Sequence, residues 1–218
     1  MVLLGRIAAS LRSRSIDCHT IAASLIQRLL DPEAPTYFME DDALELWRIL
    51  LHHAPLPSEP LIQLYPSILL HNRIDGDGPI REVLRIIESN MLLMSDEVLG
   101  RGWQEKTIVS LFDIKQMPIG VMIHVYRVIE IVTRVWTPSM MDQKIIWYLT
   151  ERLLGESDDA KIDVCILSIL SRLALADPHF VVKAWTTTPR GDCSQQVIAK
   201  YTERVSGLLH MSRRLNKR

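Results

Sequence analysis

Apolar residues in this chain recur every three or four positions over long stretches, the spacing of one face of an α-helix. The stretch from Glu40 to Pro55 shows the pattern most plainly. Asp41 and Asp42 stand at its start, where the positive end of a helix dipole favours negative charge, and Pro55 stops it. Its apolar positions are Ala43, Leu44, Trp47, Leu50, Leu51 and Ala54. Strict alternation, the mark of a half-buried strand, is almost missing, so the pattern predicts an all-α protein.

Capping residues, glycines and prolines divide the rest of the chain into further helices. Ser58 can cap the helix that follows Pro55, and Pro66 inside that helix should bend or break it. A helix begins near Pro79, and Ser95 can cap its successor. The later predicted helices run from Pro118 to about Val135, from Thr137 and Pro138 to Leu154, from Asp158 through Leu175, from a cap at Asp177, and from Ser194 to Met211. The helix after Asp158 is apolar on nearly all sides and should be buried by several neighbours.

The predicted helices form pairs that repeat at a constant interval. The first helix of each pair starts near residues 3, 41, 79, 118 and 158. An interval of about 40 residues is typical of HEAT and armadillo repeats, whereas tetratricopeptide units are several residues shorter. We therefore predict one HEAT/armadillo-like α-solenoid over residues 1–218, a right-handed superhelix of about five antiparallel helix pairs. Its approximate repeats are 1–38, 39–75, 76–116, 117–156 and 157–218.

Stacking explains where the large side chains should lie, because one helix pair exposes apolar surface that only neighbouring pairs can bury. Trp47, Trp136, Trp147 and Trp185 each fall on or beside an apolar stripe, and we predict that they pack in the core rather than bind a ligand. Trp103 stands among charged residues and fits that prediction less well.

Composition adds few constraints. The chain has 25 Lys+Arg against 26 Asp+Glu and 48% hydrophobic residues, so it can bury a continuous core, and its balanced charge favours neither nucleic acid nor a membrane as the main partner. Three cysteines far apart indicate no disulfide framework. The most apolar long segment carries several charges, which argues against a transmembrane helix. The Arg- and Ser-rich N-terminus allows a mitochondrial transit peptide as an alternative to an ordinary first helix.

Signatures of enzymes and cofactor sites are missing from the sequence. It has no phosphate-binding loop, no nucleophile elbow, no HExxH pair and no paired CxxC. The turn around Asp75 lacks the glutamate that a calcium loop needs at its twelfth position, which here is Ile86. The adjacent His52 and His53 diverge around a helix and are expected to be exposed. We predict no enzyme, no cofactor and no metal site.

Two groups of charged residues are weak candidates for partner binding. His124, Arg127, Glu130 and Arg134 lie three or four positions apart and therefore on one face of the helix from Pro118. Arg213, Arg214, Lys217 and Arg218 make the C-terminus locally basic, as in a nuclear-import or anion-binding patch. A solvated helix face and a charged helix end explain the two groups equally well.

The segments YFMEDDALELWRILLHHAP and LIQLYPSIL resemble the middle-to-C-terminal HEAT repeats of importin-β-like karyopherins, most closely those of the importin-11 type. IIESNMLLMSDEVLGRGW and FVVKAW are similar to later repeats of the same family. The resemblance runs from about Leu25 to the end. It implies a nuclear transport receptor segment, found in cytoplasm and nucleus, that binds protein cargo on a concave surface lined by the second helix of each pair.

Family members are far longer than this chain and bind the Ran GTPase mainly through N-terminal repeats, none of which matches here. Ran binding would therefore need repeats missing from this chain, and exposed solenoid ends could also self-associate. The alternative is a HEAT or armadillo scaffold outside nuclear transport that joins two other proteins.

Overall fold

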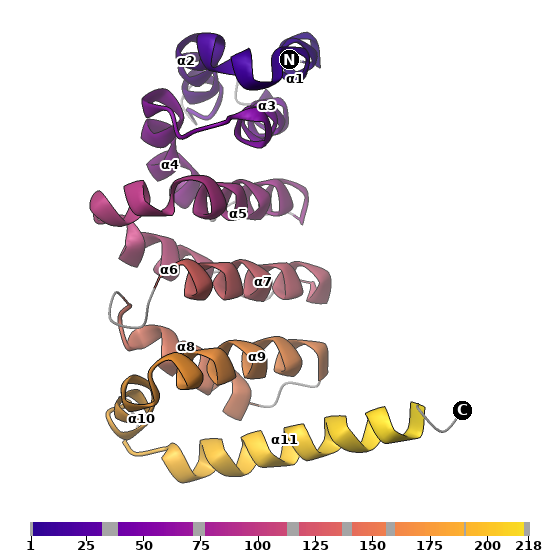
Figure 1. Cartoon of the computed structure of the whole chain (residues 1–218), viewed down its shortest axis with the longest axis vertical. Helices are drawn as coiled ribbons and strands as arrows, with labels where there is room; N and C mark the ends of the chain where they lie inside the picture. The colour runs from indigo at the N-terminus through magenta and orange to yellow at the C-terminus, as the bar shows by residue number, and fades with distance from the viewer. Residues whose placement is uncertain are drawn as a thin grey trace. The chain divides into compact units, whose positions relative to one another are not determined.

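The computed structural model describes residues 2–31, 39–71, 77–112, 118–136, 141–155, 160–189 and 191–215. These residues form helices and no strand, which confirms the all-α repeat prediction (Figure 1). The chain divides into two compact units, an N-terminal unit of residues 1–135 and a C-terminal unit of residues 136–218. The single solenoid, its repeat boundaries and its right-handed superhelix stay predictions.

Helices of the N-terminal unit lie in two layers (Figure 1). In the first layer α1, α3, α5 and α7 pack side by side, and in the second α4 packs against α2 and α6. The elements are α1 (Val2–Leu11), the 3₁₀ helix η1 (Arg12–Cys18), α2 (His19–Leu29), α3 (Glu40–His53), α4 (Glu59–His71), α5 (Asp77–Gly100), α6 (Gln104–Phe112) and α7 (Ile119–Val135).

Three first-layer helices bury their residues in the same order. Over residues 42–51, 82–91 and 124–133, the sequence of buried, half-buried and exposed positions is identical. Equivalent positions such as Asp42, Glu82 and His124 are therefore 40 and 42 residues apart. This spacing matches HEAT repeats and exceeds the tetratricopeptide unit of about 34 residues.

Two predicted boundaries in this unit can be compared with the structure. Pro66 was expected to bend or break its helix, and it lies inside α4 without ending it, so a break is wrong. A proline removes one backbone donor and crowds the preceding turn, and the buried Leu61, Tyr65 and Ile68 on either side of Pro66 hold this helix in place. The predicted boundary before Ser95 is present as a kink, because α5 consists of two helices that meet where Met94 leaves helical geometry (φ −142°, ψ 35°).

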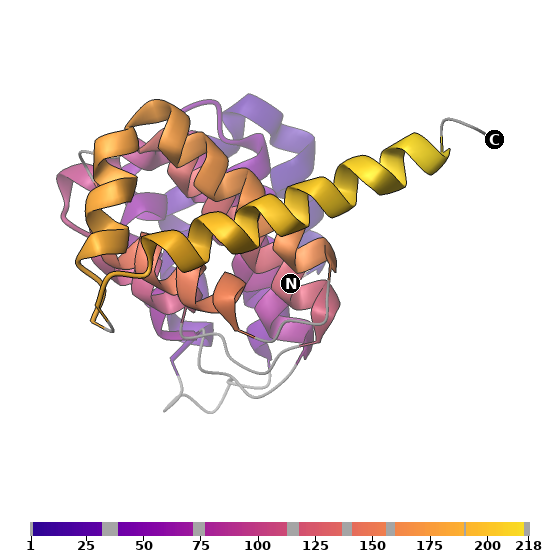
Figure 2. The same cartoon turned by 90° about the horizontal axis from the view of Figure 1, so that it is seen from below.

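The C-terminal unit contains α8 (Lys144–Leu154), α9 (Ala160–Ala176), α10 (Pro178–Thr186) and α11 (Ser194–Leu215). α8 packs on α9, α10 and α11. Asp177 caps α10 as predicted, since its Oδ1 accepts a hydrogen bond of 2.9 Å from the Phe180 N–H. Figure 2 shows α11 as one straight helix whose C-terminal end extends past the other helices of the unit.

Burial of α9 is less complete than predicted. Val164 and Leu175 leave 41% and 87% of their surface exposed, although the apolar residues on the opposite face of the helix are buried. The apolar residues of α9 therefore exceed what its neighbours within the described part of the unit cover.

The tryptophans follow the core prediction in part. Trp47 and Trp136 are fully buried. Trp147 and Trp185 are half-buried, and their indole N–H groups donate to the Ala184 carbonyl (2.8 Å) and to Thr150 Oγ1 (3.1 Å). Both residues still pack within the unit, with the polar edge of the ring satisfied.

Several predicted features lie outside the described residues: the turn around Asp75, Thr137 and Pro138, Asp158, Lys217 and Arg218. Among the helices that are described, none is by itself long and apolar enough to cross a membrane. Taken together, α9 and α10 are long and apolar enough by length and composition, but the two helices are bent by 117° relative to each other.

Candidate partner-binding surface

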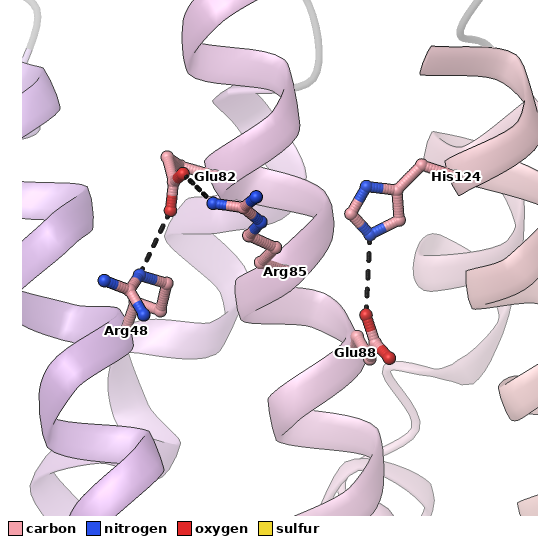
Figure 3. Close-up of polar contacts among 5 residues, drawn as sticks. All are labelled: Arg48, Glu82, Arg85, Glu88 and His124. Atoms are coloured by element: carbon pink, nitrogen blue, oxygen red, sulfur yellow. Dashed lines mark hydrogen bonds and ion pairs between the residues drawn. The ribbon is translucent and has the colours of Figure 1, made fainter. Parts of the chain in front are cut away.

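Charged side chains connect the first-layer helices of the N-terminal unit on one face (Figure 3). We call them the first-layer ladder: Arg48, Glu82, Arg85, Glu88, His124 and Arg127. Arg48 Nε on α3 lies 3.2 Å from Glu82 Oε2 on α5, and Glu82 Oε1 accepts a 2.6 Å hydrogen bond from Arg85 Nη1. These residues occupy half-buried and exposed positions of the repeated burial order. Both steps between helices start from the seventh position of that order (Arg48, Glu88) and reach the first position on the next helix (Glu82, His124), whereas the Glu82–Arg85 contact lies within α5.

Glu88 makes the next step, from α5 to α7. One of its oxygens lies 3.4 Å from His124 Nε2 and the other 3.5 Å from Arg127 Nη2. Burial lowers the pKa of His124, and the adjacent Glu88 carboxylate opposes that effect. Because Glu88 keeps Arg127 as a permanent cationic partner, this contact does not depend on protonation of His124.

The four residues predicted on α7 do not form one group. His124 and Arg127 meet at Glu88, whereas Arg134 pairs with Glu130 of its own helix at 3.0 Å. The His124 side chain is only 21% exposed, so at that position the solvated-face interpretation fails.

Sequence reasoning missed Glu88, although a signal was present. Glu88 and His124 are 36 residues apart, and Arg48 and Glu82 are 34 residues apart. Each pair combines an acidic with a basic side chain at a spacing slightly shorter than one repeat. That spacing becomes informative only after the period is known, because it places the end of one first helix beside the start of the next.

The C-terminal basic residues are less informative. Arg213 and Arg214 lie in the last turns of α11, and their side chains are outside the described part, as are Lys217 and Arg218 altogether. These four residues remain predictions.

A second group of polar and aromatic residues connects the second layer; we call it the second-layer cluster. Arg101 Nη2 donates to Glu59 Oε2 at 2.7 Å, and the guanidinium lies 5.4 Å from the centre of the Trp103 ring. Trp103 stacks on Tyr65 at 5.9 Å, and the Tyr65 hydroxyl lies 2.9 Å from Thr107 Oγ1. The Arg101 hydrogen bond lowers the pKa of Glu59, whereas burial raises the pKa of Tyr65.

The position of Trp103 explains why its sequence context was ambiguous. The ring is half-buried, with Tyr65 on one side and the Arg101 guanidinium within cation–π distance. Tryptophan and arginine are the residue types most enriched at energetically dominant positions of protein interfaces. The cluster therefore gives the second layer the chemistry of a binding surface.

His19, the first residue of α2, and Ser58, the residue before α4, form a buried contact. His19 Nδ1 lies 2.7 Å from Ser58 Oγ, and only 1% of the histidine surface is exposed. Burial lowers the pKa of His19, which favours the neutral ring. This contact belongs to the core and not to a surface site.

No group of three His, Cys, Asp or Glu side chains in the described ranges could hold a metal ion. His52 is exposed and His53 half-buried, with ring centres 5.0 Å apart in an edge-on contact.

Comparison with known proteins gives one match. A family model described as "Importin-11-like, TPR repeats" matches residues 1–213. No match was found among curated proteins or among solved structures. Although that description names TPR repeats, the 40- and 42-residue spacing of the burial order in α3, α5 and α7 has the length of HEAT units.

Proposed function

The chain belongs to the Importin-11-like repeat family, and from this premise we propose that it binds protein cargo without catalysing a reaction. The family is one of nuclear transport receptors, whose helical repeats are scaffolds. On this proposal the protein resides in cytoplasm and nucleus.

The second-layer cluster carries the proposal. Arg101 is 32% exposed and Trp103 is half-buried, so both reach the surface while Glu59 and Tyr65 fix their positions. Such pre-positioned side chains lose little conformational entropy when a partner binds. We therefore place cargo contacts on the second layer, around Arg101 and Trp103.

Affinity capture from cell extract, with and without added GTP-loaded Ran, tests this function. We expect the full chain to retain a defined set of partners that Trp103→Ala and Arg101→Glu lose. Arg81→Glu is the matched control, because Arg81 is exposed, lies on α5 of the first layer and belongs to neither the ladder nor the cluster.

The Ran arm distinguishes a transport receptor from a scaffold. Release of partners by GTP-loaded Ran supports a receptor that retains its nucleotide switch. Partners that resist Ran yet depend on Trp103 support a scaffold function, or cargo binding separated from the repeats that bind Ran. Retention of all partners by the Trp103 and Arg101 variants would contradict the placement on the second layer.

A further inference from the structure

The C-terminal unit has a groove between α9 and α11 with a volume of about 360 Å³. Its residues are Ala160, Asp163, Val164, Leu167, Glu203, Arg204 and Gly207. Small and apolar residues form most of the surface, and Gly207 has no heavy atom within 4 Å of the place where a Cβ would lie. The groove is therefore open enough to admit a side chain from another molecule.

Asp163 gives this groove its polarity. Its side chain is only 3% exposed, and Oδ2 lies 2.9 Å from Arg204 Nε. Both carboxylate oxygens are buried and accept no hydrogen bond from any residue in the described part of the chain, so the Arg204 contact is an ion pair without hydrogen-bond geometry and Oδ1 has no ion-pair partner there. Since a buried carboxylate oxygen without a donor is costly, the position favours a ligand that supplies one.

Charge in the groove favours a cation. The two carboxylates, Asp163 and Glu203, face one guanidinium, that of Arg204. Glu203 is 67% exposed and lies at the rim, where it is 3.9 Å from Lys200 Nζ. A positively charged group in the groove would lie beside the Asp163 and Glu203 side chains, which both line it.

Geometry further selects lysine over arginine. A guanidinium binds best as a fork on both oxygens of one carboxylate, and Arg204 already occupies the Oδ2 side of Asp163. An ammonium group is a compact point charge that needs only one free oxygen. The methylene stem of a lysine can lie along Val164 and Leu167, which present apolar surface in the groove.

We propose that the groove between α9 and α11 binds a lysine side chain of a partner protein, with the ammonium on Asp163 and an adjacent apolar residue on Val164. This inference rests on the proposed protein-binding function and adds the chemistry of one contact. It concerns the C-terminal unit alone.

A peptide with one central lysine flanked by leucines, fluorescently labelled and titrated with the full chain, tests the proposal by anisotropy. Replacing the lysine with norleucine should weaken binding roughly tenfold or more, because a charged hydrogen bond is lost. An arginine peptide should bind less tightly than the lysine peptide. Equal binding of the lysine and norleucine peptides, or no measurable binding of either, would overturn the proposal.

Variants locate the binding site. Val164→Lys puts a cation of the chain itself into the groove and should abolish peptide binding. Val182→Lys is the matched control, since Val182 lies on α10 outside the groove with 52% of its surface exposed. Asp163→Asn is less decisive because it also deprives Arg204 of its counter-ion. Circular dichroism melting curves confirm that the lysine variants are folded.

Two outcomes separate this inference from the proposed function. If Val164→Lys still binds the peptide while the chain captures Ran-sensitive partners, the groove assignment is wrong and the transport function stands. If the peptide binds in the groove but no partner depends on Trp103 or responds to Ran, the groove assignment stands and the cargo proposal fails.

Discussion

Trp47 is fully buried in α3, and its indole N–H has no hydrogen-bond partner among the described residues. Its contribution is therefore packing rather than hydrogen bonding. Trp47→Ala should lower the free energy of unfolding by about 3–5 kcal/mol, because it removes buried apolar surface and leaves a cavity. Trp47→Phe should cost clearly less, since no hydrogen bond is lost. Urea denaturation measures both values.

Trp147 provides the contrasting control, because its indole N–H donates to the Ala184 carbonyl at 2.8 Å. Trp147→Phe removes that bond and should cost about 1 kcal/mol on that account alone. If Trp47→Phe lowered the free energy of unfolding as much as Trp47→Ala, the result would indicate that the Trp47 N–H forms a hydrogen bond in the folded protein.

The buried His19 predicts a dependence of stability on pH. Burial lowers the pKa of this ring in the folded state, so the unfolded chain binds the proton more readily. The contribution of the neutral His19 ring to stability is therefore fully present above about pH 6.5, the pKa of histidine in the unfolded chain. It is lost as the pH falls from there toward the pKa of His19 in the folded protein. We expect the free energy of unfolding to decline steadily below about pH 6.5.

His19→Gln should flatten part of that decline in urea titrations at several pH values. The remaining slope should include His124, whose pKa burial also lowers. His52→Gln, at an exposed position of α3, is the control for the effect of a His→Gln exchange on overall stability. An unaltered slope in His19→Gln would assign the effect to other groups.

At the scale of elements, α1 and α3 approach each other closely at Gly5. A Cβ on Gly5 would lie 2.9 Å from Ile49 Cδ1, the mobile end of that side chain. Gly5→Ala should therefore be close to neutral, because Ile49 can rotate and alanine favours helix. Gly5→Val, with branched bulk, should destabilise the protein by about 1–3 kcal/mol.

Gly207 offers a matched position inside α11 with no atom near a new Cβ. Gly207→Val should leave the thermal midpoint nearly unchanged while Gly5→Val lowers it. Similar effects at both glycines would indicate that helix propensity, and not the contact of α1 with α3, decides the outcome.

The step from Arg48 to Glu82 should couple α3 to α5 weakly but measurably. Both side chains are partly exposed, so a double-mutant cycle with Arg48→Ala and Glu82→Ala should give a coupling of about 0.5–1 kcal/mol. Arg48→Ala combined with Lys106→Ala on α6 should be additive. A coupling energy indistinguishable from zero would show that this ion pair does not stabilise the packing of α3 on α5.

Most helices could be predicted from the sequence, because capping and helix periodicity depend on residues only a few positions apart. Asp177 satisfies a donor three residues away, so its role follows from local sequence. The cap predicted at Ser95 likewise follows the kink at Met94. Pro66 could not be judged from local sequence, because whether a proline ends α4 depends on packing against neighbouring helices, which periodicity does not specify.

The contacts of the candidate site were harder to predict from the sequence than the helices. The face of α7 was predicted, but the partner of His124 and Arg127 on α5 depends on how far adjacent helices are displaced along each other. The second-layer cluster likewise joins residues 42 apart, such as Glu59 and Arg101. Single-helix patterns contain no information on such pairings until the repeat period has been established.

For the whole molecule, stacked helices predict that a local defect spreads only to neighbours. α3 packs on α1, α2 and α5. In a repeat protein stability is close to a sum of units and nearest-neighbour contacts. Leu44→Ala on α3 should therefore speed backbone hydrogen exchange in α1, α2 and α5 while α9 keeps the rate of the original chain. Uniformly faster exchange in α9 as well would indicate a single cooperative unit.

The shared burial order of α3, α5 and α7 also determines how such a chain can change in length. Joining residue 41 directly to residue 82 would place Glu82 where Asp42 was and keep every later buried position on the inner face of its helix. A deletion of arbitrary size would instead rotate the following helix and turn apolar side chains outward. Viable insertions and deletions in this protein should therefore come in whole units, and a chimaera made with that spacing would inherit a complete set of helix contacts.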